Sequence, residues 1–87
     1  MLKDRQNEIL HLIIQNFSET KRATGSKTLM NQGIQASSAT IRNDMSLLES
    51  LGFIEKNHTS SGRQPTIEGL RYFVDSLLDL KKLDNLS

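Results

Sequence analysis

The fold of this chain is decided by one stretch near its middle, Gln35-Ala36-Ser37-Ser38-Ala39-Thr40-Ile41-Arg42-Asn43-Asp44-Met45-Ser46-Leu47-Leu48-Glu49-Ser50-Leu51-Gly52. Ser37 is a good N-cap for a helix, because its hydroxyl can accept from the backbone N–H groups that the first turn leaves free. Gly52 occupies the position at which a helix commonly ends on a residue with a left-handed backbone. Between these two residues, large apolar side chains recur four and three positions apart. The stretch therefore predicts a complete amphipathic helix over residues 37–51.

The two faces of this helix differ in chemistry. One face is an apolar stripe made of Ile41, Met45 and Leu48. The opposite face carries only small or polar side chains, namely Ala39, Arg42, Asn43, Ser46 and Ser50. Arginine reads guanine and asparagine reads adenine through paired hydrogen bonds in the major groove, and small neighbours let a helix approach the bases. Arg42 and Asn43 therefore favour a DNA recognition helix, although an ordinary surface helix would show the same periodicity.

Asp44 lies nearer the apolar side of this helix than the polar side. A carboxylate that pointed at phosphates would be repelled by them. We therefore expect Asp44 to be a structural partner of a hydrogen-bond donor.

Composition limits the fold to one domain with a modest core, since the chain has 87 residues. It contains no cysteine, which excludes disulfides and thiolate metal sites and suits a cytoplasmic protein. It has no apolar run of about 18 residues, so we expect no membrane span, and its start lacks the pattern of a secretory signal. It also shows no paired carboxylates, nucleophile–base arrangement or metal-ligand cluster. We therefore expect no enzyme, no metal and no cofactor, and we interpret His11 as a solvated histidine.

The charge of the chain is unevenly distributed, although its formal net value is only +1. Between Thr20 and Ser46 there are four basic residues and one acidic residue, whereas residues 65–87 hold three basic and four acidic residues. A basic region on a small domain can lie on phosphates while the other end meets a partner.

The segments before the central helix predict two further helices. The first is expected over residues 4–18, where apolar side chains recur at helical spacing. A short extended piece at residues 22–24 leads to a second, short helix that ends near Gly33. The residues expected to face the core here are Leu29, Met30 and Ile34. Two short helices joined by about four residues form a helix-turn-helix.

The start of the second helix is a candidate phosphate site. Ser26 is predicted to cap this helix, and Lys27 follows it. A phosphate there would meet free N–H groups, a hydroxyl and an ammonium together. The alternative is that Ser26 is only a cap.

After Gly52 the pattern becomes that of a β-hairpin. Residues 53–56 predict a strand, residues 57–63 a polar loop and residues 64–66 a returning strand, which Pro65 requires to be an edge strand. Such a hairpin after a helix-turn-helix is a wing. Its candidate DNA contacts are His58, Thr59, Ser60, Ser61 and Arg63. Hydroxyls can donate to phosphates, and an arginine at the base of the loop can enter a minor groove. The alternative is a disordered turn whose serines contact only water.

Thr66 is predicted to cap a last helix, over residues 67–80, whose apolar face is too broad for a small domain to cover. That face consists of Leu70, Phe73, Val74, Leu77, Leu78 and Leu80. The excess predicts contact with a second copy or a downstream domain, while the alternative is a helix packed wholly against the first one that frays beyond Lys81. We assign residues 1–80 to one winged helix-turn-helix domain, mainly α with a small β-hairpin wing. Residues 81–87 are assigned to a C-terminal tail or the start of a linker.

Much of the sequence closely resembles one family. The similar motifs are Gly25-Ser26-Lys27-Thr28-Leu29, Ser37-Ser38-Ala39-Thr40-Ile41-Arg42-Asn43-Asp44-Met45, Leu48-Glu49, Leu51-Gly52, Glu55-Lys56, His58-Thr59-Ser60-Ser61-Gly62-Arg63, Pro65-Thr66, Gly69, Arg71-Tyr72 and Val74-Asp75. They resemble the N-terminal DNA-binding domain of the bacterial heat-inducible transcription repressor HrcA family. The similarity covers almost the whole chain and is far more specific than that of a generic winged helix.

The resemblance implies a repressor of heat-shock chaperone operons in the bacterial cytoplasm, at the nucleoid. It implies a dimer on an inverted-repeat operator in double-stranded DNA, and a chaperonin that supports the active state. It places Ser38, Thr40, Arg42 and Asn43 at the groove and residues 57–64 in the wing. With the residues singled out above, the candidate DNA-facing set of the central helix is Ser37, Ser38, Ala39, Thr40, Arg42, Asn43 and Ser46.

Family members are several times longer than this chain, with sensing and dimerisation domains that it lacks. The resemblance therefore leaves two alternatives, an excised domain or a short stand-alone relative, and predicts only a weak homodimer for the chain itself. The chain also departs from the family pattern in having Ala23 and Thr24 before Gly25, and Lys3 in place of the usual threonine cap. We expect these departures to affect local stability and not the DNA-facing surface. A winged helix that binds proteins through its last helix, without reading DNA, is the second hypothesis.

Overall fold

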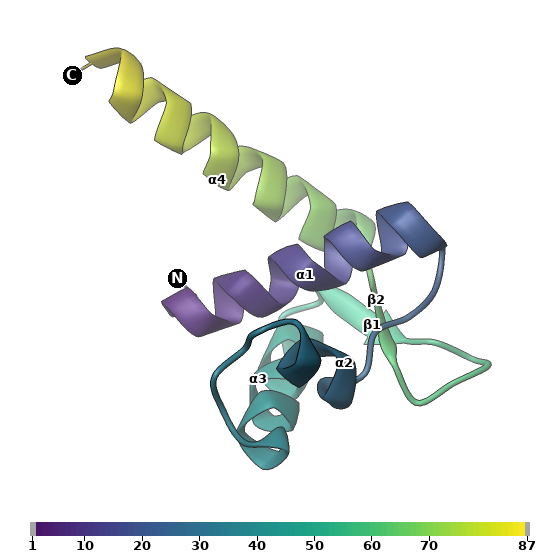
Figure 1. The fold of residues 1–87 in the computed structure, drawn as a ribbon. Helices are drawn as coiled ribbons and strands as arrows, with labels where there is room; N and C mark the ends of the chain where they lie inside the picture. Colours follow the sequence, from purple (N-terminus) through teal and green to yellow (C-terminus); the bar gives the residue numbers. More distant parts are fainter. Residues whose placement is uncertain (1, 87) are drawn as a thin grey trace.

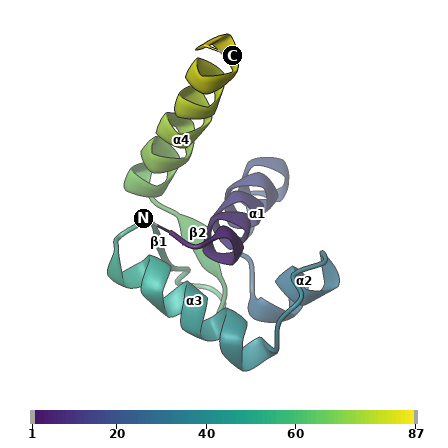
Figure 2. The same cartoon turned by 90° about the vertical axis from the view of Figure 1, so that its left-hand side faces the viewer.

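The computed structural model describes the backbone of residues 2–86 and the side chains of residues 2–79. Its helices are α1 (Asp4–Thr20), α2 (Ser26–Asn31), α3 (Ser38–Ser50) and α4 (Ile67–Leu86), and its strands are β1 (Ile54–Lys56) and β2 (Arg63–Pro65). The first three helices and the hairpin form the body, and α4 projects away from it (Figures 1 and 2). The predicted winged helix-turn-helix fold is confirmed. In the described part of the chain, no helix has the length and apolar character needed to cross a membrane.

One apolar core joins α1, α2, α3 and β1. Its most deeply buried side chains are Ile9, Leu10, Ile13, Leu29, Ile41, Leu48 and Ile54. The apolar stripe predicted for α3 is confirmed, because none of its three residues is more than 4% exposed. Ile34 is buried as expected, but Met30 is 41% exposed, so its predicted inward packing is wrong. Since α2 is short, Leu29 alone occupies its core-facing position, and the next residue is turned by about 100° toward solvent.

The predicted ends of α3 and the start of α4 are confirmed by their capping bonds. Ser37 Oγ accepts from the backbone N–H of Thr40 at 3.1 Å. Gly52 has a φ of 83°, the left-handed conformation that a helix end favours. At the start of α4, Thr66 Oγ1 accepts from the backbone N–H of Gly69 at 3.0 Å.

The other helix ends differ from the predictions. Gly25 holds the N-cap position of α2 and Ser26 is the first helical residue, so the predicted capping role of Ser26 is wrong. Glycine is also accepted at this position, since it takes the extended backbone of a cap without strain. The predicted ends of α1 and α4 fall short, because α1 continues to Thr20 and α4 to Leu86. After residue 69, no proline or glycine interrupts α4.

The wing is a two-stranded antiparallel hairpin with a third strand-like contact. Ile54 lies opposite Pro65 and Lys56 opposite Arg63, so β2 begins one residue earlier than predicted. Thr24 forms a bridge to the other side of Arg63, with backbone N–H···O bonds of 2.8 Å in both directions. This bridge confirms the extended piece predicted over residues 22–24 at its last residue, Thr24. The edge position predicted from Pro65 is confirmed, because the described sheet has two strands and the isolated bridge engages Arg63 alone. Among the described residues, Gln64 and Pro65, the latter without an N–H, have no strand partner on that side.

The two departures from the family pattern are accommodated by local hydrogen bonds. Thr24 is 2% exposed, and its hydroxyl accepts from Asn16 Nδ2 at 3.2 Å, so the buried polar atom has a partner. Lys3 holds the N-cap position of α1, and its backbone N–H donates to Gln6 Oε1 at 3.0 Å. Their effect on local stability stays a prediction.

Candidate nucleic-acid interface

The side of α3 that carries Arg42 and Asn43 faces away from the core. Both side chains are exposed, as is Ser46, while the apolar stripe on the other side is buried. Figure 2 shows α3 along the edge of the molecule opposite α4. Arg42 Nη2 donates to Ser38 Oγ at 3.2 Å, so the guanidinium lies along the helix surface toward its N-terminal end. Among the side chains that the structure describes, none buries Arg42, Asn43 or Ser46.

This orientation is held by Asp44, which the helical wheel placed near the buried side. The Asp44 carboxylate accepts from Arg5 Nε and, at 3.2 Å, from Gln6 Nε2, both on α1. The expectation of a structural partner to a donor is therefore confirmed. The hydrogen bond from Arg5 is the main reason that the pKa of Asp44 is lowered, and burial acts in the opposite direction.

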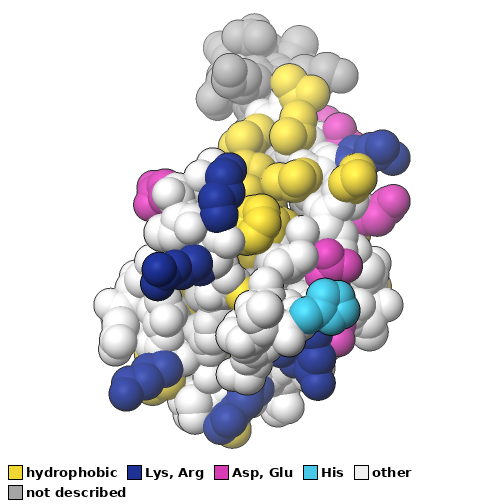
Figure 3. Space-filling model, turned by 90° about the vertical axis from the view of Figure 1, so that its right-hand side faces the viewer, with side chains coloured by type: hydrophobic (Ala, Val, Ile, Leu, Met, Phe, Trp, Pro, Cys, Tyr) yellow, Lys and Arg dark blue, Asp and Glu magenta, His cyan; other side chains and the backbone are white. Residues whose placement is uncertain are grey.

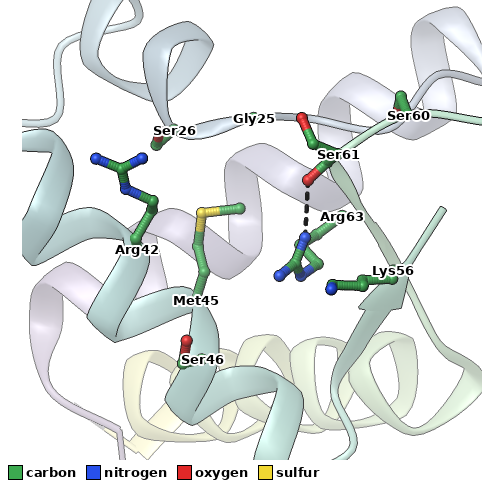
Figure 4. A pocket seen from close by; sticks show the side chains of 9 residues that line it. All are labelled: Gly25, Ser26, Arg42, Met45, Ser46, Lys56, Ser60, Ser61 and Arg63. Atoms are coloured by element: carbon green, nitrogen blue, oxygen red, sulfur yellow. Dashed lines mark hydrogen bonds between the residues drawn. The ribbon is translucent and has the colours of Figure 1, made fainter.

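A cleft of about 410 Å³ lies between α3, the start of α2 and the wing (Figure 4). It is lined by Gly25, Ser26, Arg42, Met45, Ser46, Lys56, Ser60, Ser61 and Arg63. The structure thus brings together predicted site residues from three separate segments of the chain. Among these lining residues are three cations and no carboxylate, a composition that suits a phosphate group.

Other predicted residues lie outside this cleft. Lys27, Ala39, Asn43, His58 and Thr59 are exposed on the surface but do not line it. Ser37 and Thr40 also lie outside, and their hydroxyls bond to each other at 3.0 Å at the start of α3. Within the described residues no group of histidine, cysteine or acidic side chains is placed to hold a metal ion.

Lys56 is the main functional candidate that sequence reasoning missed. Alternate residues of a strand share a face, so Lys56 points to the same side as the buried Ile54 but lies beyond the end of the core. Its side chain therefore enters the cleft. The period-two pattern of residues 53–56 was the signal that could have found it. The sequence also did not predict that Gly25 and Met45 line the cleft, because neither residue carries a charge or a strong hydrogen-bonding side chain.

The wing loop is built by its own hydrogen bonds. Asn57 Oδ1 accepts from the Thr59 backbone N–H at 2.8 Å and from the Thr59 hydroxyl. Asn57 Nδ2 donates to Gln64 Oε1 at 2.7 Å, and the Gly62 N–H donates to Ser60 Oγ at 3.2 Å. The loop is therefore an organised turn, in which the Ser60 hydroxyl keeps its own hydrogen free to donate.

Arg63 is engaged by groups of the protein itself. Its Nε donates to Glu49 Oε1 on α3 at 2.8 Å, and its Nη1 donates to the backbone oxygen of Ser61 at 2.8 Å. The side chain is only 16% exposed. Entry of this guanidinium into a minor groove would require both contacts to break, and the predicted DNA contact of Arg63 stays a prediction.

The apolar face of α4 forms a second candidate surface, on a different part of the molecule. Leu70, Val74, Leu77 and Leu78 are between 42% and 52% exposed. Phe73 is half-buried, and its ring lies 4.9 Å from the ring of the exposed His11. The side chain of Leu80 lies outside the described residues. Figure 3 shows apolar side chains gathered below the end of α4, so this helix is not packed wholly against α1.

Comparison with known proteins identifies the family. A family model described as "Winged helix-turn-helix transcription repressor, HrcA DNA-binding" matches residues 1–76. The chain belongs to this family. Members of the HrcA DNA-binding family are domains of transcription repressors and not enzymes, as the sequence led us to expect. The division of the chain at residue 80 stays a prediction.

Curated relatives carry the same name. The chain is 55% identical over 83 residues to the "Heat-inducible transcription repressor HrcA" of Tetragenococcus halophilus, covering 95% of this chain and 24% of the relative. It is 57% identical over 79 residues to that of Lactobacillus delbrueckii subsp. bulgaricus, covering 90% of this chain and 23% of the relative. The chain thus spans about a quarter of the length of the curated relatives it matches.

A solved structure agrees with this assignment. It is titled "Crystal structure of a hypothetical protein at 2.2 A resolution" and matches with a TM-score of 0.83 and 43% identity. The match covers 94% of this chain and 26% of that chain. The HrcA-type winged helix is therefore supported by both sequence and fold.

Proposed function

We propose that this chain is the sequence-specific DNA-binding module of a heat-inducible transcription repressor of heat-shock chaperone genes. In this proposal α3 lies in the major groove of double-stranded DNA, and the wing, residues 57–64, lies on the backbone or in a minor groove. The observation that carries it is the outward orientation of Arg42 and Asn43 on a helix whose opposite face is buried.

The contacts divide into two kinds with different consequences. Arg42 and Asn43 reach base edges and supply sequence discrimination, with small neighbours that permit close approach. The side chains at the start of α2 and in the wing contact phosphates, which sets affinity and register without reading sequence. The proposed backbone contacts are Ser26, Lys27, His58, Thr59, Ser60 and Ser61. Ser37, Ser38, Ala39, Thr40 and Ser46 line the approach of α3 to the groove.

The proposed partners follow from the repressors that the chain resembles. A homodimer binds an inverted-repeat operator, because two linked half-sites make the second contact intramolecular. In the chain alone this dimer is weak. The chaperonin acts through parts of the relatives that this chain does not span. The proposed location is the bacterial cytoplasm, at the nucleoid.

The test is a fluorescence-anisotropy titration of the 87-residue chain against an inverted-repeat duplex and a scrambled duplex of the same composition, at two salt concentrations. We expect tighter binding to the inverted repeat at both concentrations, and weaker binding to both duplexes at the higher one. Equal affinity for the two duplexes would overturn sequence-specific recognition.

A second function is favoured by the exposed leucines and valine of α4. A patch of this kind on a small domain is typical of a protein-interaction surface. Light scattering alongside the titration separates the two functions. Self-association without any binding to either duplex would support the interaction module and count against the DNA-binding one.

A further inference from the structure

We infer that Arg63 and Glu49 form a positioning pair that holds the wing against α3, and that Lys56 is the cation of the wing that contacts phosphate. The second half of this inference rests on the proposed DNA-binding function. The first half concerns the free protein and can be tested without DNA.

The Arg63 side chain joins two segments that local structure alone would leave independent. Its Nε bond reaches Glu49, near the end of α3, while its Nη1 bond reaches Ser61 in the loop. One guanidinium therefore ties the wing loop, the strand β2 and the recognition helix together. A lysine could not do the same, because it lacks the planar fork that presents two donors at a fixed angle.

The backbone of Arg63 is held as well. Its N–H and C=O pair with Thr24 at 2.8 Å, and the preceding residue, Gly62, accepts from the Asn57 N–H at 3.2 Å. The base of the wing is thus fixed from the α1–α2 connection on one side and from α3 on the other. Of these links, the Arg63–Glu49 bond is the one that connects α3 to the wing, and it is made by side chains.

The charges in the cleft favour a division of roles between its two wing cations. Lys56 and Arg63 lie directly opposite each other in the hairpin, where two like charges destabilise the pairing. Glu49 offsets the charge of Arg63 and removes this conflict. Lys56 is exposed and has no ion-pair partner among the described side chains, so its charge remains available to a phosphate.

Figure 4 shows the geometry that follows. Lys56 and Arg63 extend from the hairpin on one side of the cleft, and Arg42 and Ser46 come from α3 on the other. The width of this opening is set by how the hairpin sits on α3. A pair that holds the hairpin in place therefore controls whether Lys56 and Arg42 can meet the DNA backbone and the bases at the same time.

The positioning role of the Arg63–Glu49 pair is tested first in the free 87-residue chain, by measuring hydrogen exchange of the backbone amides in the wing. In Glu49→Gln and Arg63→Ala we expect the exchange of the Asn57 and Gly62 amides to rise about two- to fivefold, as expected for the loss of a partly exposed ion pair. The amides of α1 should be unchanged. Glu8→Gln is the control, since it neutralises an exposed carboxylate on α1, away from the wing. Unchanged wing exchange in both variants would overturn the positioning role.

The consequence for DNA binding is tested by measuring affinity at several salt concentrations. The duplex is one that the unchanged chain has selected from a random library. We expect Glu49→Gln to weaken binding about three- to tenfold, although removing a negative charge should by itself strengthen it. Arg63→Lys and Arg63→Ala should weaken it similarly. The double variant Glu49→Gln with Arg63→Ala should be no weaker than either single variant, because both break one contact. The slope of log affinity against log salt should stay the same in these variants and fall by about one in Lys56→Gln.

The opposite pattern would overturn the inference. If Arg63 contacted a phosphate directly, Arg63→Ala would flatten the slope by about one, Arg63→Lys would keep most of the affinity, and Glu49→Gln would bind as well as the unchanged chain or better. An unaltered slope in Lys56→Gln would refute its phosphate contact. If no duplex that the chain binds were selected from the library, the proposed function and the phosphate contact of Lys56 would both be refuted. The amide exchange measurement would still show whether the Arg63–Glu49 pair positions the wing.

Discussion

Arg5 on α1 and Asp44 on α3 form an ion pair, with 2.5 Å between Arg5 Nε and Asp44 Oδ2. Gln6 donates to the same carboxylate, and the Asp44 side chain is only 7% exposed. Two donors from the first turns of α1 therefore replace the water that this charge would otherwise need. Because the carboxylate cannot leave these donors, the pair fixes the rotation of α3 about its own axis and thereby selects the side chains that face outward.

This pair predicts a loss of stability in acid. The hydrogen bond from Arg5 is the main cause that lowers the pKa of Asp44. A carboxyl group with a lower pKa in the folded state contributes stability that is fully present above its unfolded pKa, near 4, and is lost as the pH falls through the folded pKa. We expect Asp44→Asn to lose about 1–3 kcal/mol of unfolding free energy at pH 7. Urea unfolding at a series of pH values should show this difference shrinking below about pH 4.

Asp75→Asn is the control for this experiment, since Asp75 is an exposed carboxyl on α4. It should change the unfolding free energy little at any pH. A difference between Asp44→Asn and the unchanged chain that stayed constant down to pH 2 would show that the loss comes from packing and not from the ionised carboxylate.

A second prediction concerns the contact between α4 and the segment before β1. A Cβ atom on Gly69 would lie 2.1 Å from the backbone oxygen of Phe53, far inside contact distance. The backbone N–H of Thr66 also donates to this oxygen at 3.1 Å, so neither side can move freely. We expect Gly69→Ala to cost about 3 kcal/mol or more in unfolding free energy, despite the better helix propensity of alanine.

Thermal or urea unfolding measures this cost directly. Arg71→Ala, at an exposed position two residues further along the same helix, is the matched control and should change stability by less than about 0.5 kcal/mol. Equal stability of the two variants would mean that the start of α4 does not approach Phe53 as closely as the structure shows.

The features that could be predicted from the sequence are those that depend on neighbouring residues. Ser37 caps α3 and Gly52 ends it, because a hydroxyl and a left-handed backbone act within one turn. The burial of Ile41 follows from the helical period. The same period placed Asp44 toward the core and so predicted a donor for it, although it could not tell that the donor would be Arg5.

The features that could not be predicted depend on contacts between distant segments. The Arg63–Glu49 bond spans 14 residues and joins a strand to a helix, so the local sequence pattern around neither residue predicts it. Ser26 was expected to be a cap because serine is favoured there, but the bridge of Thr24 to the wing places Gly25 at that position instead. Tertiary pairing, and not propensity, decided both outcomes.

Base recognition is tested by alanine substitutions on α3. Because a good bidentate contact contributes about 1–3 kcal/mol of discrimination, Arg42→Ala and Asn43→Ala should each narrow the preference for the operator over a scrambled duplex by about five- to 150-fold. Lys27→Ala should instead weaken binding to both duplexes alike and reduce the salt slope by about one. Fluorescence anisotropy at several salt concentrations measures both quantities.

Arg71→Ala serves again as the control, since it removes a cation on α4 that does not line the cleft. It should leave the preference between the duplexes intact. If Arg42→Ala and Asn43→Ala discriminated between the duplexes as well as the unchanged chain does, base reading through this face of α3 would be wrong.

The apolar face of α4 gives the last prediction. Val74 and Leu78 are four residues apart and are 50% and 52% exposed, so they lie side by side on the outer surface of the helix. Burying such a patch against a second copy removes only a few apolar side chains from water, and we expect a weak dimer that forms at high concentration. The double variant Val74→Lys with Leu78→Lys should be monomeric in sedimentation velocity while binding a single half-site with unchanged affinity. Asp75→Lys adds a positive charge to the same turn without removing an apolar group, and it should still dimerise. A chain that remained monomeric at all concentrations would show instead that this face does not pair with its own copy, and the exposed side chains would then need a different partner.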